Sequence, residues 1–232
     1  MFKTARLVLC VCFCLSSLNA ASFHAAGDFS TTTNPNGPWS YGGTPTLGGT
    51  FTASTIAGPS PSCSNSNLTG WVTAGDQPYV LSPLGGQQDC AGSITVPTGV
   101  LDMHPTSDGI YSVVRFTSPY AGIFDVTGFF QALHYGDTDD HVLASGTPIT
   151  NLYLQSNHQG SVAGFSLTVN LNAGDTLDFA VGMGSNGYAG DSTAFDATIT
   201  DASQTPEPAT WFLIASGLCA ATVLRRRSAR SV

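Results

Sequence analysis

Positively charged side chains are almost missing from the middle of this chain of 232 residues. Of its seven lysines and arginines, Arg115 is the only one between Arg6 and Arg225. The fifteen acidic residues all fall between Asp28 and Glu207, so that segment has a net charge of about −14 with histidine neutral. Proteins bind nucleic acids and anionic lipid surfaces through patches of lysine and arginine side chains. This segment has almost no such side chains, so both are poor partners.

Catalytic motifs are also missing. The sequence has no Gly-x-Ser-x-Gly elbow, no His-Glu-x-x-His and no phosphate-binding glycine loop. Glycoside hydrolysis needs two carboxylates, one of them with a raised pKa, and no motif singles out a pair among the aspartates. We therefore predict that the protein is not an enzyme, with a glycan hydrolase as the weaker alternative.

The single glutamate, Glu207, lies between Pro206 and Pro208, directly ahead of sixteen uncharged residues at 209–224. A helix of that length rises about 24 Å, slightly less than the hydrocarbon layer of a bilayer. We predict that 209–224 crosses a membrane, with some thinning of the bilayer or snorkelling of the flanking side chains. Arg225, Arg226 and Arg227 follow at once and would hold the far end of the helix in the cytoplasm.

Residues 205–232 resemble the PEP-CTERM sorting signal of exported Gram-negative proteins, because the Pro-Glu-Pro motif, a short apolar helix and an arginine cluster occur in that order at the chain end. The resemblance implies recognition by an exosortase, cleavage near the motif, and transfer from the inner membrane to the cell surface or an extracellular polysaccharide matrix. A plain C-terminal membrane anchor is the alternative.

The N-terminus also indicates export. Lys3 and Arg6 precede an apolar run at 7–18, and small residues follow up to Ala26. This is the layout of a secretory signal peptide, which implies the Sec machinery and signal peptidase. We assign 1–26 to the signal peptide, 27–204 to one exported domain, in which 27–70 is the least certain part, and 205–232 to the sorting signal.

Cysteines are scarce in the exported domain, which contains only Cys63 and Cys90. Two cysteines in an oxidising compartment are expected to pair. Closing a loop of about 28 residues would stabilise the fold by roughly 3.5 kcal/mol in the chain-entropy model.

Alternation of apolar and polar residues dominates the second half of the domain. It is clearest at 165–171 and 177–181, where it predicts a β-hairpin with one buried face. Further strands are predicted at 112–117, 122–130, 141–144, 149–155 and 193–200. Short strands separated by glycine and proline turns, without crossover helices, predict an all-β antiparallel sandwich of jelly-roll type.

The sequence of residues 100–199, which includes the segment LNAGDTLDFAVG at 171–182, is similar to those of the galactose-binding-like jelly rolls used as carbohydrate-binding modules. The resemblance implies sugar binding and a structural calcium ion.

The segment 134–141 concentrates three carboxylates and two imidazoles in eight residues. Oxygen ligands from Asp137, Asp139 and Asp140 would suit calcium, although the EF-hand template does not fit. A solvated polar loop is the favoured interpretation, and zinc held by His134 and His141 is a further alternative. A second acidic loop at 186–191 could complete a calcium site if the fold brings it near.

Aromatic side chains offer a second kind of site, because their faces stack on pyranose rings. The candidates are Trp39, Tyr41, Trp71, Tyr79, Tyr120, Tyr135, Tyr153 and Tyr188. Trp39 and Trp71 are singled out because they lie in turn-rich sequence, against the alternative that both are buried. Arg115 alternates with Val114 and Phe116 and is predicted to face outward or form a structural ion pair with an aspartate.

These observations predict an exported, non-catalytic β-sandwich of the cell surface, associated with exopolysaccharide. A carbohydrate-binding module proper is the alternative function.

Overall fold

The computed structural model describes residues 20–59, 67–73, 78–84, 88–90, 94–154 and 158–202. Every element in these ranges is a β-strand, and every strand pair is antiparallel. The predicted all-β class is therefore confirmed for the described part of the chain. That part holds no helix suited to crossing a bilayer.

The strands, in chain order, are β1 (Ser22–His24), β2 (Trp39–Thr44), β3 (Thr52–Ala53), β4 (Ile56–Pro59), β5 (Leu68–Val72), β6 (Tyr79–Pro83), β7 (Gln88–Cys90), β8 (Ile94–Val96), β9 (Leu101–His104), β10 (Tyr111–Thr117), β11 (Gly122–Ala132), β12 (Thr138–Ala144), β13 (Thr147–Leu154), β14 (Val162–Leu171), β15 (Thr176–Gly182) and β16 (Thr193–Asp201).

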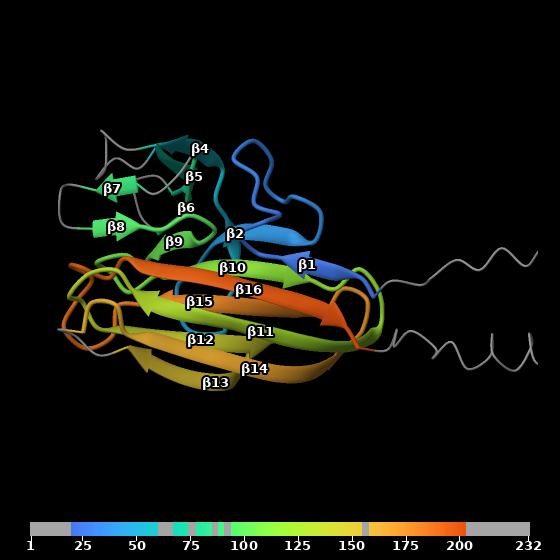
Figure 1. Ribbon diagram of the computed structural model, residues 1–232. Coiled ribbons are helices and arrows are strands. Elements are labelled where there is room, and N and C mark those ends of the chain that lie inside the picture. Colours follow the sequence, from blue (N-terminus) through green and yellow to red (C-terminus); the bar gives the residue numbers. More distant parts are fainter. Residues whose placement is uncertain are drawn as a thin grey trace, which may run out of the picture. The chain divides into compact units, whose positions relative to one another are not determined.

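Two sheets pack face to face (Figure 1). The first has the order β14-β11-β16-β9-β6-β5-β4, with β1 added to β16, and the second has the order β13-β12-β15-β10-β2-β3. Strands β7 and β8 form a separate small pair.

The last eight strands form a jelly roll. Strand β9 pairs with β16, β10 with β15, β11 with β14, and β12 with β13, so the chain folds back on itself as one long ribbon. Wrapping that ribbon gives the order β9-β16-β11-β14 in one sheet and β10-β15-β12-β13 in the other. This is the double Greek key of a jelly roll, as the sequence predicted.

The predicted hairpin at 165–171 and 177–181 is wrong. The two segments are strands, but β14 pairs only with β11 in the first sheet, whereas β15 lies between β10 and β12 in the second. The turn between them bonds to another turn, with Gly174 N donating to Ser118 O and Ser118 N donating to Asp175 O, both at 2.8 Å. The chain therefore crosses from one sheet to the other here.

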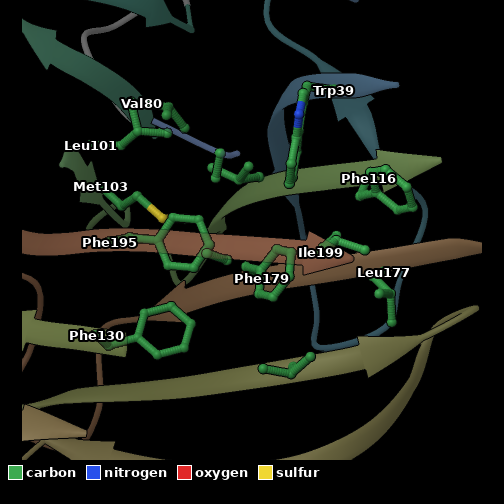
Figure 2. Close-up of a cluster of buried hydrophobic side chains, with 14 of the residues drawn as sticks. Trp39, Val80, Leu101, Met103, Phe116, Phe130, Leu177, Phe179, Phe195 and Ile199 are labelled. Carbon is green, nitrogen blue, oxygen red and sulfur yellow. The ribbon is translucent and has the colours of Figure 1, made fainter. Parts of the chain in front are cut away.

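The core between the sheets is rich in aromatic rings (Figure 2). The Phe195 ring lies 5.1 Å from Phe130 and 4.9 Å from Phe179, and the Trp39 ring lies 5.3 Å from Phe116, measured between centroids. All five side chains are fully buried. Each contributes on the order of 1.5–3 kcal/mol by leaving water, which makes this cluster the main source of stability.

The domain begins before residue 27, the boundary that the sequence suggested. Ser22, Phe23 and His24 pair with β16, and the Ala25 side chain is fully buried in the core. A leader cut after Ala26 would remove this strand, so only a cut before Ser22 leaves the described sheet complete.

The outer face of the second sheet contains the predicted structural ion pair. Arg115 donates from Nε and Nη2 to the two carboxylate oxygens of Asp178 at 2.6 and 2.7 Å. The Phe51 ring lies against Arg115, with its centroid 4.3 Å from the guanidinium carbon. Asp178 is only 2% exposed.

Several predicted features lie outside the described residues. These are the signal peptide up to residue 19, Cys63, the sorting motif Pro206, Glu207 and Pro208, the helix 209–224, and the arginine cluster. Cys90 is described only as part of the backbone of β7, so the disulfide prediction stays a prediction.

Candidate functional site

Two loops meet at one end of the jelly roll. Residues 133–137 join β11 to β12, residues 183–192 join β15 to β16, and we call them the loop pair. Leu133 N donates to Ser192 O at 2.9 Å, and Gly136 N donates to Gly190 O at 3.0 Å. The loop pair lies opposite the end at which the described chain begins with β1 and finishes with β16 (Figure 1).

Two glycines allow the loops to approach this closely. A Cβ at Gly136 would lie 1.9 Å from Asp191 Oδ1, and a Cβ at Gly190 would lie 2.7 Å from His134 Nδ1. Gly190 also has a φ of +87°, which side chains rarely adopt. The packing of the two loops therefore requires glycine at 136 and 190.

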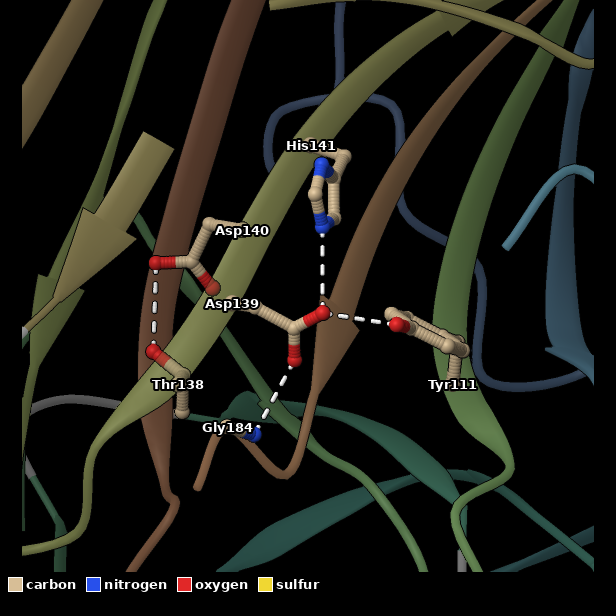
Figure 3. A network of polar contacts seen from close by, with 6 residues as sticks. All are labelled: Tyr111, Thr138, Asp139, Asp140, His141 and Gly184. Carbon is tan, nitrogen blue, oxygen red and sulfur yellow. Dashed lines mark hydrogen bonds and ion pairs between the residues drawn. The ribbon is translucent and has the colours of Figure 1, made fainter. Parts of the chain in front are cut away.

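Asp139 is the most strongly bonded carboxylate of the site (Figure 3). Its Oδ2 accepts from Tyr111 Oη at 2.6 Å and lies 3.1 Å from His141 Nε2, and its Oδ1 accepts from Gly184 N at 3.0 Å. Burial raises the pKa of Asp139, but the hydrogen bonds from His141, Tyr111 and Gly184 outweigh it, and the pKa is lowered. Asp139 is therefore ionised at neutral pH, with 28% of its side chain exposed.

Asp137 fixes the shape of the second loop. Its Oδ2 accepts from Ser185 Oγ at 2.7 Å and its Oδ1 accepts from Asn186 N at 3.0 Å. The carboxylate is buried, whereas Ser185 and Asn186 are exposed. Asp137 thus holds a polar turn at the surface.

Two further carboxyl groups are buried and have oxygens without a hydrogen-bond partner, which we call bare oxygens. Asp191 is 1% exposed and neither of its carboxyl oxygens has a hydrogen-bond partner, and Oδ1 of the fully buried Asp140 also has none. Burial, followed by the negative charges of Asp137 and Asp139, raises the pKa of Asp191 to about 8. Burial also raises the pKa of Asp140 far above its ordinary value. Both groups are therefore protonated at mildly acidic pH.

The described residues do not bring Asp137, Asp139 and Asp140, the candidates for the calcium alternative, together as one metal-binding group. The described residues contain no group of three His, Cys, Asp or Glu side chains placed to hold a metal ion. Asp139 and Asp140 are consecutive on a strand and point to opposite faces of the sheet, and Asp137 already binds the 185–186 turn. His141 Nε2 lies 3.1 Å from Asp139 Oδ2, and no metal-binding group of the described residues includes His134 and His141.

Beneath the loop pair, a buried polar layer reaches into the first sheet. Tyr79 Oη lies 3.2 Å from Ser192 Oγ and donates to Asp102 Oδ2 at 3.4 Å. Burial raises the pKa of Asp102 to about 8, a shift that the Tyr79 hydrogen bond only partly offsets. Burial likewise lowers the pKa of His104, whose Nδ1 lies 2.8 Å from Pro105 O.

Two exposed aromatic rings stand on the loop pair. Tyr135 is 56% exposed and Tyr188 is 39% exposed. Each ring has a histidine beside it, since the centroids of Tyr135 and His134 are 5.0 Å apart and those of Tyr188 and His104 are 6.2 Å apart. Among the residues whose side chains the structure describes, which do not include Tyr153, these two are the only aromatic members of the exposed large hydrophobic side chains.

The two tryptophans singled out as sugar contacts are buried instead. Trp39 is 0% and Trp71 is 6% exposed, and both indole N–H groups have partners, the Asp28 carboxylate at 3.3 Å and Ser30 O at 2.6 Å. The prediction that Trp39 and Trp71 contact sugar is therefore wrong, because turn-rich sequence around an aromatic residue does not decide its burial. Tyr135 and Tyr188 were among the wider set of aromatic candidates. The glycines and aspartates beside them in the sequence were the available signal that these two rings lie on loops.

Comparison with known proteins found only distant likenesses. No family model and no curated protein matches this sequence. A family 35 carbohydrate-binding module from Clostridium thermocellum is 13% identical, covers 50% of this chain and 87% of that chain, and has a TM-score of 0.34. A family 35 module from an environmental isolate is 16% identical, covers 55% and 96%, and has a TM-score of 0.33.

A CBM51 module of a Clostridium perfringens GH95 protein, solved in complex with methyl-galactose, is 12% identical and covers 58% of this chain and 86% of that chain, with a TM-score of 0.33. Likenesses at this level of identity and TM-score assign no function to this chain.

Proposed function

We propose that this protein is an exported, non-catalytic β-sandwich that binds a polysaccharide through the loop pair. The observation that carries the proposal is the placement of the exposed aromatic rings. Two exposed rings, Tyr135 and Tyr188, stand on loops that are hydrogen-bonded to each other. A soluble domain gains no stability from exposed tyrosines, whereas their faces stack well on the apolar faces of sugar rings.

The polar groups beside the rings suit sugar hydroxyls. Ser185 and Asn186 are exposed on a turn fixed by Asp137, and the partly exposed Asp139 is held by three hydrogen bonds. A binding surface made of side chains that are already fixed loses little conformational entropy when a ligand arrives.

The sorting features support an extracellular role for this surface. The leader at the N-terminus and the Pro206-Glu207-Pro208 motif, helix 209–224 and arginine cluster at the C-terminus favour export and processing by an exosortase. The described domain ends at residue 202, at the end of the sandwich opposite the loop pair (Figure 1). Attachment through the C-terminus would then leave the loop pair unobstructed by the point of attachment.

Binding of the full-length chain to a panel of soluble neutral, cationic and anionic polysaccharides tests the proposed site. We expect Tyr135→Ala and Tyr188→Ala each to weaken the strongest binding about tenfold, as loss of an anchoring aromatic does. Ile123→Ala is the matched control, because Ile123 is 46% exposed and lies near the start of β11, away from the loop pair. Binding to no polysaccharide, or binding that survives both tyrosine changes, would refute the site.

The mass of the mature protein from its native cells tests the sorting proposal. Exosortase processing predicts the loss of helix 209–224 and the arginine cluster together with the leader. A mature protein that keeps its C-terminus would show a plain membrane anchor instead.

A further inference from the structure

The only cation of the exported domain is not available to a ligand. Arg115 is the single Lys or Arg between Arg6 and Arg225, and both oxygens of the Asp178 carboxylate bind it. The Phe51 ring covers its guanidinium at 4.3 Å. A polysaccharide that carries carboxylate or sulfate groups would therefore meet no lysine or arginine in this domain to pair with them.

The loop pair is rich in carboxyl groups instead. Asp137, Asp139, Asp140 and Asp191 lie on it or directly beside it, and the exposed Asp108 belongs to the neighbouring loop between β9 and β10. A Cβ added to Gly109 in that loop would lie 3.8 Å from Met183 Cε, which places the two loops in contact. Asp139 is ionised and partly exposed, so it adds a fixed negative charge next to the tyrosine-bearing loops.

A second observation comes from a buried carboxyl group at the same end. Asp191 is 1% exposed, both of its carboxyl oxygens are without a hydrogen-bond partner, and its Oδ1 lies against Gly136 at the contact between the two loops. Burial and the nearby carboxylates of Asp137 and Asp139 keep Asp191 protonated at mildly acidic pH, so the ionised Asp139 is the negative charge that an ammonium group would meet. A positive group at the surface of the loop pair would lower the electrostatic cost of this cluster, whereas a negative group would increase it.

We propose, resting on the proposed function, that the ligand is a polysaccharide with free amino groups, and that the loop pair selects it over acetylated and acidic polysaccharides. An ammonium group would form a charge-assisted hydrogen bond with Asp139 while the sugar ring stacks on a tyrosine. The negative field of the whole domain adds attraction at long range and increases the rate of encounter. A metal ion is the less suitable occupant, because no three metal-ligating side chains of the described residues converge.

Three related oligosaccharides separate this selectivity from sugar binding in general. The full-length chain, kept in a mild detergent, is titrated with glucosamine oligomers, N-acetylglucosamine oligomers and galacturonate oligomers of equal length. The pH is set where the amines are protonated. We expect the glucosamine oligomers to bind about tenfold more tightly than the acetylated ones, and the advantage to shrink as salt screens the charges. The galacturonate oligomers should bind most weakly.

The outcomes distinguish the two proposals. Equal binding of amino and acetylated oligomers, weakened by Tyr135→Ala, would overturn the selectivity and leave polysaccharide binding intact. Tightest binding of galacturonate oligomers would overturn the selectivity in the same way. Binding of none of the three oligomers, and of none of the polysaccharides in the panel above, would overturn both.

Two variants with the same change in net charge locate the effect. Asp139→Asn should remove most of the preference for amino oligomers, whereas Asp125→Asn should keep it, because Asp125 is exposed on β11 and accepts from Thr168 at the opposite end of the sandwich. Equal losses in both variants would show a general charge effect and no amine subsite. Asp108→Asn provides the same comparison with an exposed carboxylate if Asp139→Asn does not fold.

Discussion

The core of the sandwich and the loop pair use the same residue types in opposite ways. In the core, aromatic rings are buried and both tryptophans have hydrogen-bond partners for their N–H groups. On the loop pair, two tyrosines are exposed, and beneath them lie carboxyl groups with bare oxygens. Tyr41 Oη in the core also has no hydrogen-bond partner, so the exposure of the rings, and not hydrogen bonding, separates the loop pair from the core.

The largest effect is expected from removing a core ring. Trp39→Ala should destabilise the protein by about 4 kcal/mol, because a fully buried tryptophan leaves a cavity that the two sheets cannot close. Chemical denaturation measures this loss. A cost below about 1 kcal/mol would mean that Trp39 is not a core residue, and the comparison between the two regions would break down.

The buried ion pair should give the next largest effect. Arg115→Leu leaves the Asp178 carboxylate buried without its partner, and we expect a loss of about 3 kcal/mol. The double variant Arg115→Leu with Asp178→Leu is the control, since replacing both charges by apolar side chains is often close to neutral. A double variant as unstable as the single one would show that shape, and not the unpaired charge, is responsible.

The buried carboxyl groups should make stability depend on pH. The pKa of Asp102 and that of Asp191 are raised to about 8 in the folded protein, whereas an unfolded aspartate has its ordinary value near 4. Below pH 4 both states are protonated. Between about pH 4 and 8 only the unfolded state is ionised, so stability falls as the pH rises, by at most about 1.4 kcal/mol per pH unit for each group.

Asp102→Asn should reduce this slope, because the amide cannot ionise and can still bond to Tyr79. Denaturation at a series of pH values compares this variant with Asp125→Asn, whose exposed side chain should leave the slope unchanged. A wild-type stability that is flat between pH 4 and 8 would contradict the raised pKa values.

The smallest effect on stability is expected at the binding surface. Tyr135→Ala and Tyr188→Ala should change the free energy of unfolding by no more than about 0.5 kcal/mol each, since both rings are exposed. The same variants should lose binding. A loss of stability comparable with that of Trp39→Ala would place these rings among the structural residues and remove the contrast.

Much of the fold followed from local patterns in the sequence. Alternation at 112–117, 122–130 and 193–200 identified three strands of the jelly roll, because a strand with one buried face must alternate. The place of Arg115 between two apolar residues predicted that its side chain leaves the core, to face outward or to pair with an aspartate, without identifying Asp178 as the partner. These inferences succeeded because each depends on residues that are close in the sequence.

The inferences that failed all depended on which distant segments meet. Alternation at 165–171 and 177–181 fits a hairpin as well as a crossover between sheets. In the structure, the turn between these segments is hydrogen-bonded to Ser118, and the two strands lie in different sheets. Trp39 and Trp71 lie in turn-rich sequence, but packing in the core between distant strands buries both.

The sequence by itself determined the strand class, and it determined the low number of cations and the acidic character of residues 28–207, since composition and alternation are properties of the chain alone. Only the tertiary structure decided that residues 133–137 and 183–192 lie together, that Tyr135 and Tyr188 are exposed, and that Asp191 is buried without a partner. The physical reason is that burial and electrostatic interactions depend on distances in space, and these loops are about 50 residues apart along the chain and are brought together by the wrapping of the ribbon.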